Sequence, residues 1–96
     1  MTGTSRSSEG LSERRRRLLF RSWHRGIREM DLIMGRFADS CIETLSDAEL
    51  DAYERLIDVP DPVLYGWIGD FDPVPAEFDT PLFRRLKLFH QSGQGA

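Results

Sequence analysis

The chain has 96 residues, of which 40% are hydrophobic and 30% are charged. This length suits one domain, and the composition is too apolar for a wholly disordered protein. No apolar run exceeds three residues, so neither membrane insertion nor a secretory signal is expected. One cysteine, Cys41, excludes an internal disulfide and a multi-cysteine zinc site. A reducing, cytoplasmic location is therefore expected.

Charge is distributed unevenly along the chain, although the net charge is only −3. Residues 1–28 hold eight arginines and two acidic residues, whereas residues 29–83 hold fourteen acidic residues and two arginines. Three basic residues follow from residue 84 onward. The electric field of such a charge distribution steers the encounter with a partner more than it sets the affinity. The uneven charge predicts that the protein docks on a partner, but it does not identify that partner.

The first two helices are predicted from apolar residues at helical spacing. One is expected over residues 12–24 and the next over residues 27–45, between flexible tails at 1–11 and 92–96. Gly26 separates them, because a glycine inside a helix costs roughly 1 kcal/mol relative to alanine. The apolar positions are Leu19, Phe20, Trp23 and Ile27, followed by Met30, Ile33, Met34, Phe37, Cys41, Ile42 and Leu45.

Capping patterns predict three further helices. Residues 46–49 (Ser-Asp-Ala-Glu) form a capping box that begins the third helix, and Pro60 ends it. Asp61 is expected to cap a fourth helix that Gly69 ends, and Thr80 to cap a fifth, each cap being followed by a proline. No stretch shows the alternation of a strand. The predicted fold class is all-α, a small single-domain bundle of five short helices over residues 12–91.

Few residues offer catalytic or metal-binding chemistry. His24 and His90 are the only histidines, and neither has ligands at metal-binding spacing. Cys41 falls on an apolar helical stripe, where a free cysteine acts as a small hydrophobe. No glycine-rich phosphate loop is present. We expect a protein that is not an enzyme, with no catalytic residue, no metal and no cofactor of its own.

The run from Arg14 to Arg17 raises nucleic-acid binding as an alternative, because arginines bind phosphates. However, the isoelectric point is about 5.3, and no groove-reading or base-stacking motif accompanies the run. A solvated helix surface, or a docking surface for an acidic protein, is favoured. No nucleic-acid partner is expected.

The segment around Gly26 combines charges with bare backbone. Arg25 and Glu29 are four residues apart, as are Ile27 and Asp31, so their side chains can project together at a helix start. Gly26 lets a partner approach the backbone closely. On spacing alone, an Arg25–Glu29 ion pair across a helix junction is the simpler interpretation.

This segment resembles the signature of the succinate dehydrogenase assembly (flavinylation) factors, the SdhE-like FAD assembly factors. Residues 25–31 match Arg-Gly-x-x-Glu with its usual Asp extension. Residues 45–49 resemble the family's Leu-Ser-Asp-x-Glu, and residues 61–68 resemble its Asp-Pro-Asp-Leu-aromatic-x-Trp-aliphatic motif, with Val63 and Gly66 as departures. Three motifs in the family's order make the resemblance fairly specific.

The resemblance implies an assembly chaperone that binds the flavoprotein subunit of succinate dehydrogenase and promotes covalent attachment of FAD to it. The flavoprotein of fumarate reductase is a second candidate partner, and the FAD belongs to the partner. The factor is expected to be a monomer when free. The resemblance implies a partner-binding surface made of Arg25, Gly26, Ile27, Arg28, Glu29 and Asp31.

Two other classes stay open on the sequence. One is a helical protein-interaction adaptor or antitoxin-like regulator with another partner. The other, less favoured, is a nucleic-acid binder that uses residues 14–17. Copurification from a native extract distinguishes them, because only the favoured function requires the flavoprotein subunit.

Overall fold

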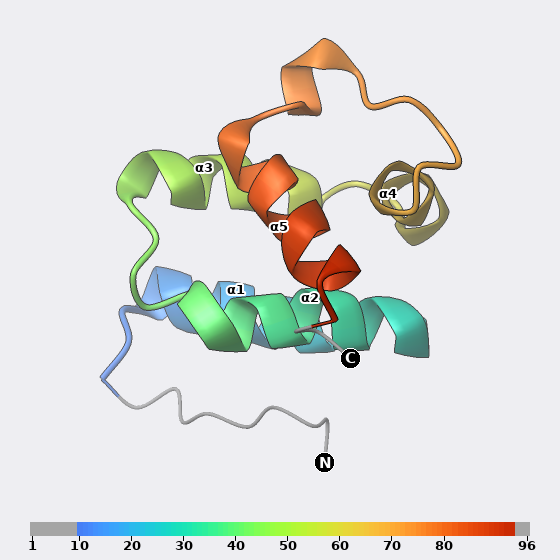
Figure 1. Ribbon diagram of the computed structural model, residues 1–96. Coiled ribbons are helices and arrows are strands. Elements are labelled where there is room, and N and C mark those ends of the chain that lie inside the picture. The colour runs from blue at the N-terminus through green and yellow to red at the C-terminus, as the bar shows by residue number, and fades with distance from the viewer. Residues whose placement is uncertain (1–9, 94–96) are drawn as a thin grey trace.

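The computed structural model describes residues 10–93, which form five α-helices and one short 3-10 helix (Figure 1). Within this range there is no strand, which confirms the predicted all-α bundle. Flexible tails are predicted over residues 1–11 and 92–96, of which residues 1–9 and 94–96 lie outside the described residues. The elements are α1 (Glu13–Trp23), α2 (Arg28–Cys41), α3 (Asp47–Ile57), α4 (Asp61–Ile68), η1 (Ala76–Phe78) and α5 (Pro81–Gln91).

The helices are arranged around an antiparallel pair. α1 and α2 lie side by side and run in opposite directions, with their connection at one end of the bundle (Figure 1). α3 packs on α1, and α5 crosses between α3 and α2 while also contacting α4. None of the helices in residues 10–93 is long and apolar enough to cross a membrane.

Local capping explains where several helices begin. Ser46 Oγ accepts from the backbone N–H of Glu49 at 3.1 Å, and Glu49 Oε1 accepts from the backbone N–H of Ser46 at 2.8 Å. Thr80 Oγ1 accepts from the N–H of Phe83 at 3.1 Å, and Ser12 caps α1 in the same way. These bonds satisfy N–H groups that have no partner within the helix. The predicted capping box and the predicted Thr80 cap are confirmed.

Two helix boundaries differ from the prediction. The N-cap of α4 is Pro60, and Asp61 is the first helical residue, with no side-chain cap bond. α2 ends at Cys41 rather than at residue 45, because the N–H groups of Thr44 and Leu45 both bond back to the carbonyl of Cys41 in a turn. Leu45 is nevertheless buried, since the turn directs it into the core.

The core takes apolar side chains from all five helices and is joined by one buried polar contact. Tyr53 is fully buried, and its hydroxyl lies 2.6 Å from Ser22 Oγ and donates to the carbonyl of Met34 at 3.3 Å. Burial raises the pKa of the Tyr53 phenol, since desolvation disfavours the charged form. This hydroxyl therefore connects α1, α2 and α3 as a neutral donor.

Three apolar residues lie elsewhere than the sequence indicates. Leu11, assigned to the N-terminal tail, is only 8% exposed and belongs to the core. Phe20 and Ile27, assigned to the apolar stripe of the first helix, are 62% and 42% exposed. Phe20 is turned outward because Leu18, Leu19 and Trp23 already occupy the inner face of α1.

A close contact between α1 and α2 predicts a strong effect at Gly35. A Cβ added there would overlap the indole ring of Trp23, whose Nε1 donates to Asp39 Oδ1 at 3.1 Å. We expect Gly35→Ala to lower the free energy of unfolding by about 1–3 kcal/mol through overpacking, despite the better helix propensity of alanine. Urea denaturation measures the change. An unchanged or higher midpoint would show that Trp23 can move aside freely.

Candidate functional site

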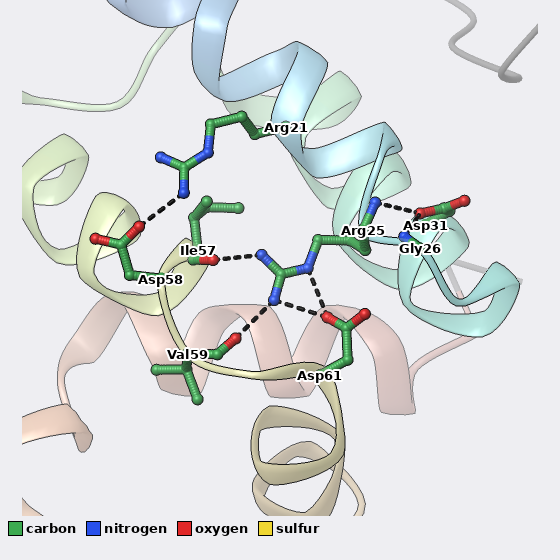
Figure 2. A network of polar contacts seen from close by, with 8 residues as sticks. All are labelled: Arg21, Arg25, Gly26, Asp31, Ile57, Asp58, Val59 and Asp61. Atoms are coloured by element: carbon green, nitrogen blue, oxygen red, sulfur yellow. Dashed lines mark hydrogen bonds and ion pairs between the residues drawn. The ribbon is translucent and has the colours of Figure 1, made fainter.

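The connection between α1 and α2, together with the first turn of α2, carries all six sequence-predicted site residues. Figure 2 shows that the side chain of Arg25 points into the molecule, toward the connection between α3 and α4. The carboxylate of Asp31 points back at the loop. Residues 26–29 between them are exposed to solvent, whereas Met30 is buried in the core. The structure therefore separates the signature into inward and outward groups.

Arg25 is a buried structural anchor. Its guanidinium donates from Nε to Asp61 Oδ1 at 2.8 Å, and Nη2 lies 2.7 Å from the same oxygen. It also donates to the carbonyls of Ile57 at 2.5 Å and Val59 at 2.8 Å (Figure 2). The exposed fractions of the Arg25 and Asp61 side chains are 7% and 9%. The ion pair suggested by spacing, between Arg25 and Glu29, is not formed.

The partners of Arg25 follow from the end of α3. The last carbonyls of a helix have no N–H partner within it, and those of Ile57 and Val59 lie at and just beyond the end of α3. A guanidinium carries five N–H donors in a fixed fork, so it can serve these carbonyls and the Asp61 carboxylate together. Asp61 is available because it does not cap α4.

Asp31 fixes the backbone of the loop. Its Oδ1 accepts from the N–H of Arg25 at 2.5 Å and from the N–H of Gly26 at 3.3 Å. Gly26 adopts a φ of +107°, a conformation that other residues rarely take. Apart from Gly26 and its two chain neighbours, no atom of residues 10–93 lies within 4 Å of the position that a Cβ would occupy on Gly26. The glycine is required for its backbone angle and leaves open space above the loop.

The outward part of the signature consists of Gly26, Ile27, Arg28 and Glu29, which we call the signature surface. Ile27 is 42% exposed, and the side chains of Arg28 and Glu29 are also exposed. Within residues 10–93 the structure gives neither charged side chain a hydrogen bond or ion pair. These charges are therefore available to a partner without breaking an internal contact.

The other residues considered for chemistry have structural surroundings. His24 stacks on Phe20 with ring centroids 3.8 Å apart. Cys41 is buried, its thiol donates to the carbonyl of Phe37, and burial raises the pKa of the thiol. No group of three His, Cys, Asp or Glu side chains in the described part of the chain is placed to hold a metal ion.

Sequence reasoning missed the contribution of Asp61 to this site. The Asp-Pro pair at residues 61–62 was interpreted only as a helix start, whereas its carboxylate holds the signature arginine from 36 residues away. The available signals are an acidic residue at a helix start and an arginine beside a glycine, and each has a nearer role in the sequence, as a helix cap and as the partner of Glu29. Neither signal specifies the pairing without the fold.

Similarities to known proteins extend over most of the chain. A family described as "Flavinator of succinate dehydrogenase" matches residues 16–90, which include the signature and Asp61. The "FAD assembly factor SdhE" of Acetobacter pasteurianus is 39% identical over 80 residues, which cover 83% of this chain and 73% of that protein.

Longer mitochondrial proteins are also similar. The "Succinate dehydrogenase assembly factor 2, mitochondrial" of Scheffersomyces stipitis is 37% identical over 86 residues, covering 85% of this chain and 58% of its own length. The "Succinate dehydrogenase assembly factor 2-A, mitochondrial" of Drosophila yakuba is 35% identical over 92 residues, covering 94% and 57%. Because the family match spans α1 to α5, the chain belongs to the family of succinate dehydrogenase flavinators.

Proposed function

We propose that this protein binds the flavoprotein subunit of succinate dehydrogenase and promotes the covalent attachment of FAD to that subunit. The family match, to flavinators of succinate dehydrogenase, supports this function, and the names of the relatives support it as well. The observation that carries the proposal is the exposure of the signature surface. Its loop is held in place by the hydrogen bonds of Arg25 and Asp31. The FAD belongs to the partner, and the protein acts as a chaperone without catalytic groups.

The mechanism we propose is stabilisation of one conformation of the flavoprotein. A factor that binds this conformation better than the alternatives increases its population. If that conformation aligns the flavin with the accepting side chain, attachment is accelerated by proximity. In this account Gly26 permits close backbone approach, Ile27 supplies apolar contact, and Arg28 and Glu29 form charged hydrogen bonds. Arg25 and Asp31 act indirectly, by holding the loop.

We propose that the protein also serves the flavoprotein of fumarate reductase, the second candidate partner that the sequence resemblance implies. We propose that the free protein is a monomer that meets either flavoprotein as a single copy. Copurification of each flavoprotein subunit with the tagged protein tests the first statement. Sedimentation of the purified protein alone tests the second.

The decisive comparison is between Gly26→Arg and Gly26→Ala. Both variants accept the same backbone strain at φ +107°, but only arginine places a long side chain above the loop. We expect Gly26→Ala to retain binding at a somewhat lower melting temperature. Gly26→Arg is expected to melt similarly yet fail to bind, with little fluorescence from covalent FAD in the flavoprotein of cells that carry it. In-gel fluorescence and a pull-down measure the two properties.

The controls test the proposed function and the position of the binding surface separately. Cells that lack the protein but attach FAD normally, or a wild-type protein that retains no flavoprotein subunit, would contradict the proposed function. Wild-type binding together with equal binding by Gly26→Arg would contradict only the position of the surface. In that case Gly26 would be needed for its backbone angle alone.

A further inference from the structure

A second exposed feature of α1 takes no part in the signature surface. The solvent side of the helix, which we call the outer face, is formed by Arg16, Arg17, Phe20 and Arg21. With Glu13 these residues line an open hollow of about 460 Å³. Phe20 lies among the three arginines, and 62% of its surface is exposed. The hollow therefore brings one large exposed aromatic ring and three arginines together on one surface of the protein.

The arginine run divides between internal and external roles. Arg14 donates from Nε to Glu54 Oε2 at 2.8 Å, and this hydrogen bond lowers the pKa of the Glu54 carboxyl. Arg15 donates to the carbonyl of Ile42 at 2.6 Å. Both side chains are half-buried, so they join α1 to α3 and to the end of α2. The part of the run that can meet a partner is therefore limited to Arg16 and Arg17.

The charges of the outer face are weakly neutralised. The structure gives Arg16 no hydrogen bond or ion pair within residues 10–93, and the contact of Arg17 is with Glu13 at 3.6 Å. Arg21 pairs with Asp58 at 2.7 Å, but both side chains are exposed. Exposed pairs of this kind contribute little to folding, so exchange with a partner's carboxylates costs little.

The ring of Phe20 is positioned by its contact with His24. Its ring stacks on that of His24 with an interplanar angle of 16°, and His24 Nδ1 lies 2.7 Å from the carbonyl of Phe20. One ring face is thus covered by the imidazole. Because His24 directly precedes Arg25, the outer face ends where the signature begins. Aromatic residues and arginines are the types enriched in protein interfaces.

We propose that the outer face of α1 is a second docking surface, which takes an acidic segment of the flavoprotein partner; this inference rests on the proposed function. Carboxylates of that segment pair with Arg16 and Arg17, and an apolar side chain covers Phe20. Guanidinium groups bind carboxylates through paired hydrogen bonds. A nucleic acid is a poorer occupant, because the net charge of the protein is −3 and no groove-reading motif accompanies the arginines of this face.

The test compares Arg16→Glu with Arg84→Glu in binding to the purified flavoprotein subunit. The two variants change the net charge equally, and Arg84 is an exposed residue of α5, a helix that packs on α2, α3 and α4 rather than on α1 and whose Arg84 pairs with Asp79. We expect Arg16→Glu to weaken binding by about tenfold at 50 mM salt, chiefly through slower association. The loss is expected to be smaller at 300 mM salt, because the salt screens the interaction between the charges. Arg84→Glu is expected to stay within about twofold of wild type.

Phe20→Ala tests the apolar half of the surface. We expect a loss of about fivefold or more that persists at 300 mM salt, because apolar contact is not screened. Melting temperatures of all three variants are expected to stay near that of wild type, since the substituted side chains are exposed. Biolayer interferometry at 50, 150 and 300 mM salt supplies both rates and affinities.

The outcomes keep the two proposals distinct. No binding by the wild-type protein would contradict the proposed function itself. Wild-type binding with unchanged affinity in Arg16→Glu and Phe20→Ala would overturn the second docking surface alone. Equal losses in Arg16→Glu and Arg84→Glu would show only a general effect of net charge and would also overturn it. Binding of a 20-base-pair DNA duplex that is lost in Arg16→Glu, with flavoprotein binding intact, would assign the face to nucleic acid.

Discussion

Arg25→Ala is expected to lower the free energy of unfolding by about 3–5 kcal/mol, because it leaves Asp61 as a buried charge without its partner. The carbonyls of Ile57 and Val59 lose their donors as well. A domain of this size is stabilised by roughly 5–15 kcal/mol, so the loss is a large share of the total. The measurement is urea denaturation followed by far-ultraviolet circular dichroism.

Three comparisons identify the cause of this loss. Arg25→Lys keeps the charge but not the planar fork, so an intermediate loss is expected. Arg25→Ala combined with Asp61→Ala is expected to recover part of the stability, since no unpaired charge stays buried. Glu29→Ala, at an exposed position, is expected to change the free energy of unfolding by about 0.5 kcal/mol or less. Equal stability of Arg25→Ala and wild type would contradict the anchoring role.

This expectation changes how a functional defect at Arg25 is interpreted. Spacing alone suggests that Arg25 and Glu29 are equivalent exposed charges, and that either can be removed without destabilising the fold. The structure shows instead that only Glu29 is exposed. Loss of covalent FAD in cells that carry Arg25→Ala therefore reports a disturbed loop or a lower protein level. The same loss with Glu29→Ala would report a missing contact.

Trp67→Ala is expected to cost about 3–5 kcal/mol, as large-to-small changes of buried aromatic residues do. Only 7% of Trp67 is exposed, as its helical spacing from Leu64 and its position beside Ile68 on the apolar face of the fourth helix predict. Its ring centroid lies 5.1 Å from that of Phe78 and 6.5 Å from that of Phe83. The substitution would remove the ring contacts that Trp67 of α4 makes with Phe78 of η1 and Phe83 of α5.

The matched control for Trp67 lies on the same helix. Tyr65 is 41% exposed and stacks only on Phe71, which is itself exposed. We expect Tyr65→Ala to cost less than about 1 kcal/mol. The fluorescence of Trp23 follows unfolding in both variants, since Trp23 is the tryptophan that stays in Trp67→Ala. Similar losses at the two positions would contradict a core role specific to Trp67.

Features that depend on nearby residues were predictable from the sequence. The capping box at Ser46 and Glu49 and the cap at Thr80 join groups three residues apart, so the pattern contains the whole interaction. Helical spacing also located the buried side of most helices. It failed for Phe20, because Phe20 adjoins Leu19 in sequence but lies about 100° around the helix from it. The buried face of α1 already includes the neighbours Leu18 and Leu19, so the next residue falls on the solvent side.

Features that depend on the tertiary fold were not predictable. The position of the signature was found from its residues, but the direction of each side chain was not. Arg25 has a suitable partner four residues away in Glu29, yet it binds Asp61 and two carbonyls at the end of α3. These acceptors become available only when the end of α3 is folded against the loop. Competition between a local and a distant carboxylate is decided by burial, which the pattern does not contain.

The bracing of the loop by Arg25 and Asp31 has a consequence for the kinetics of encounter. Loops that become ordered on binding lose conformational entropy at that step, which lowers affinity and slows productive association. Here the backbone amides of Arg25 and Gly26 are already bonded to a carboxylate of the same protein. The loop therefore loses this entropy when the factor folds. Docking on the proposed partner can then proceed without rearrangement of this loop.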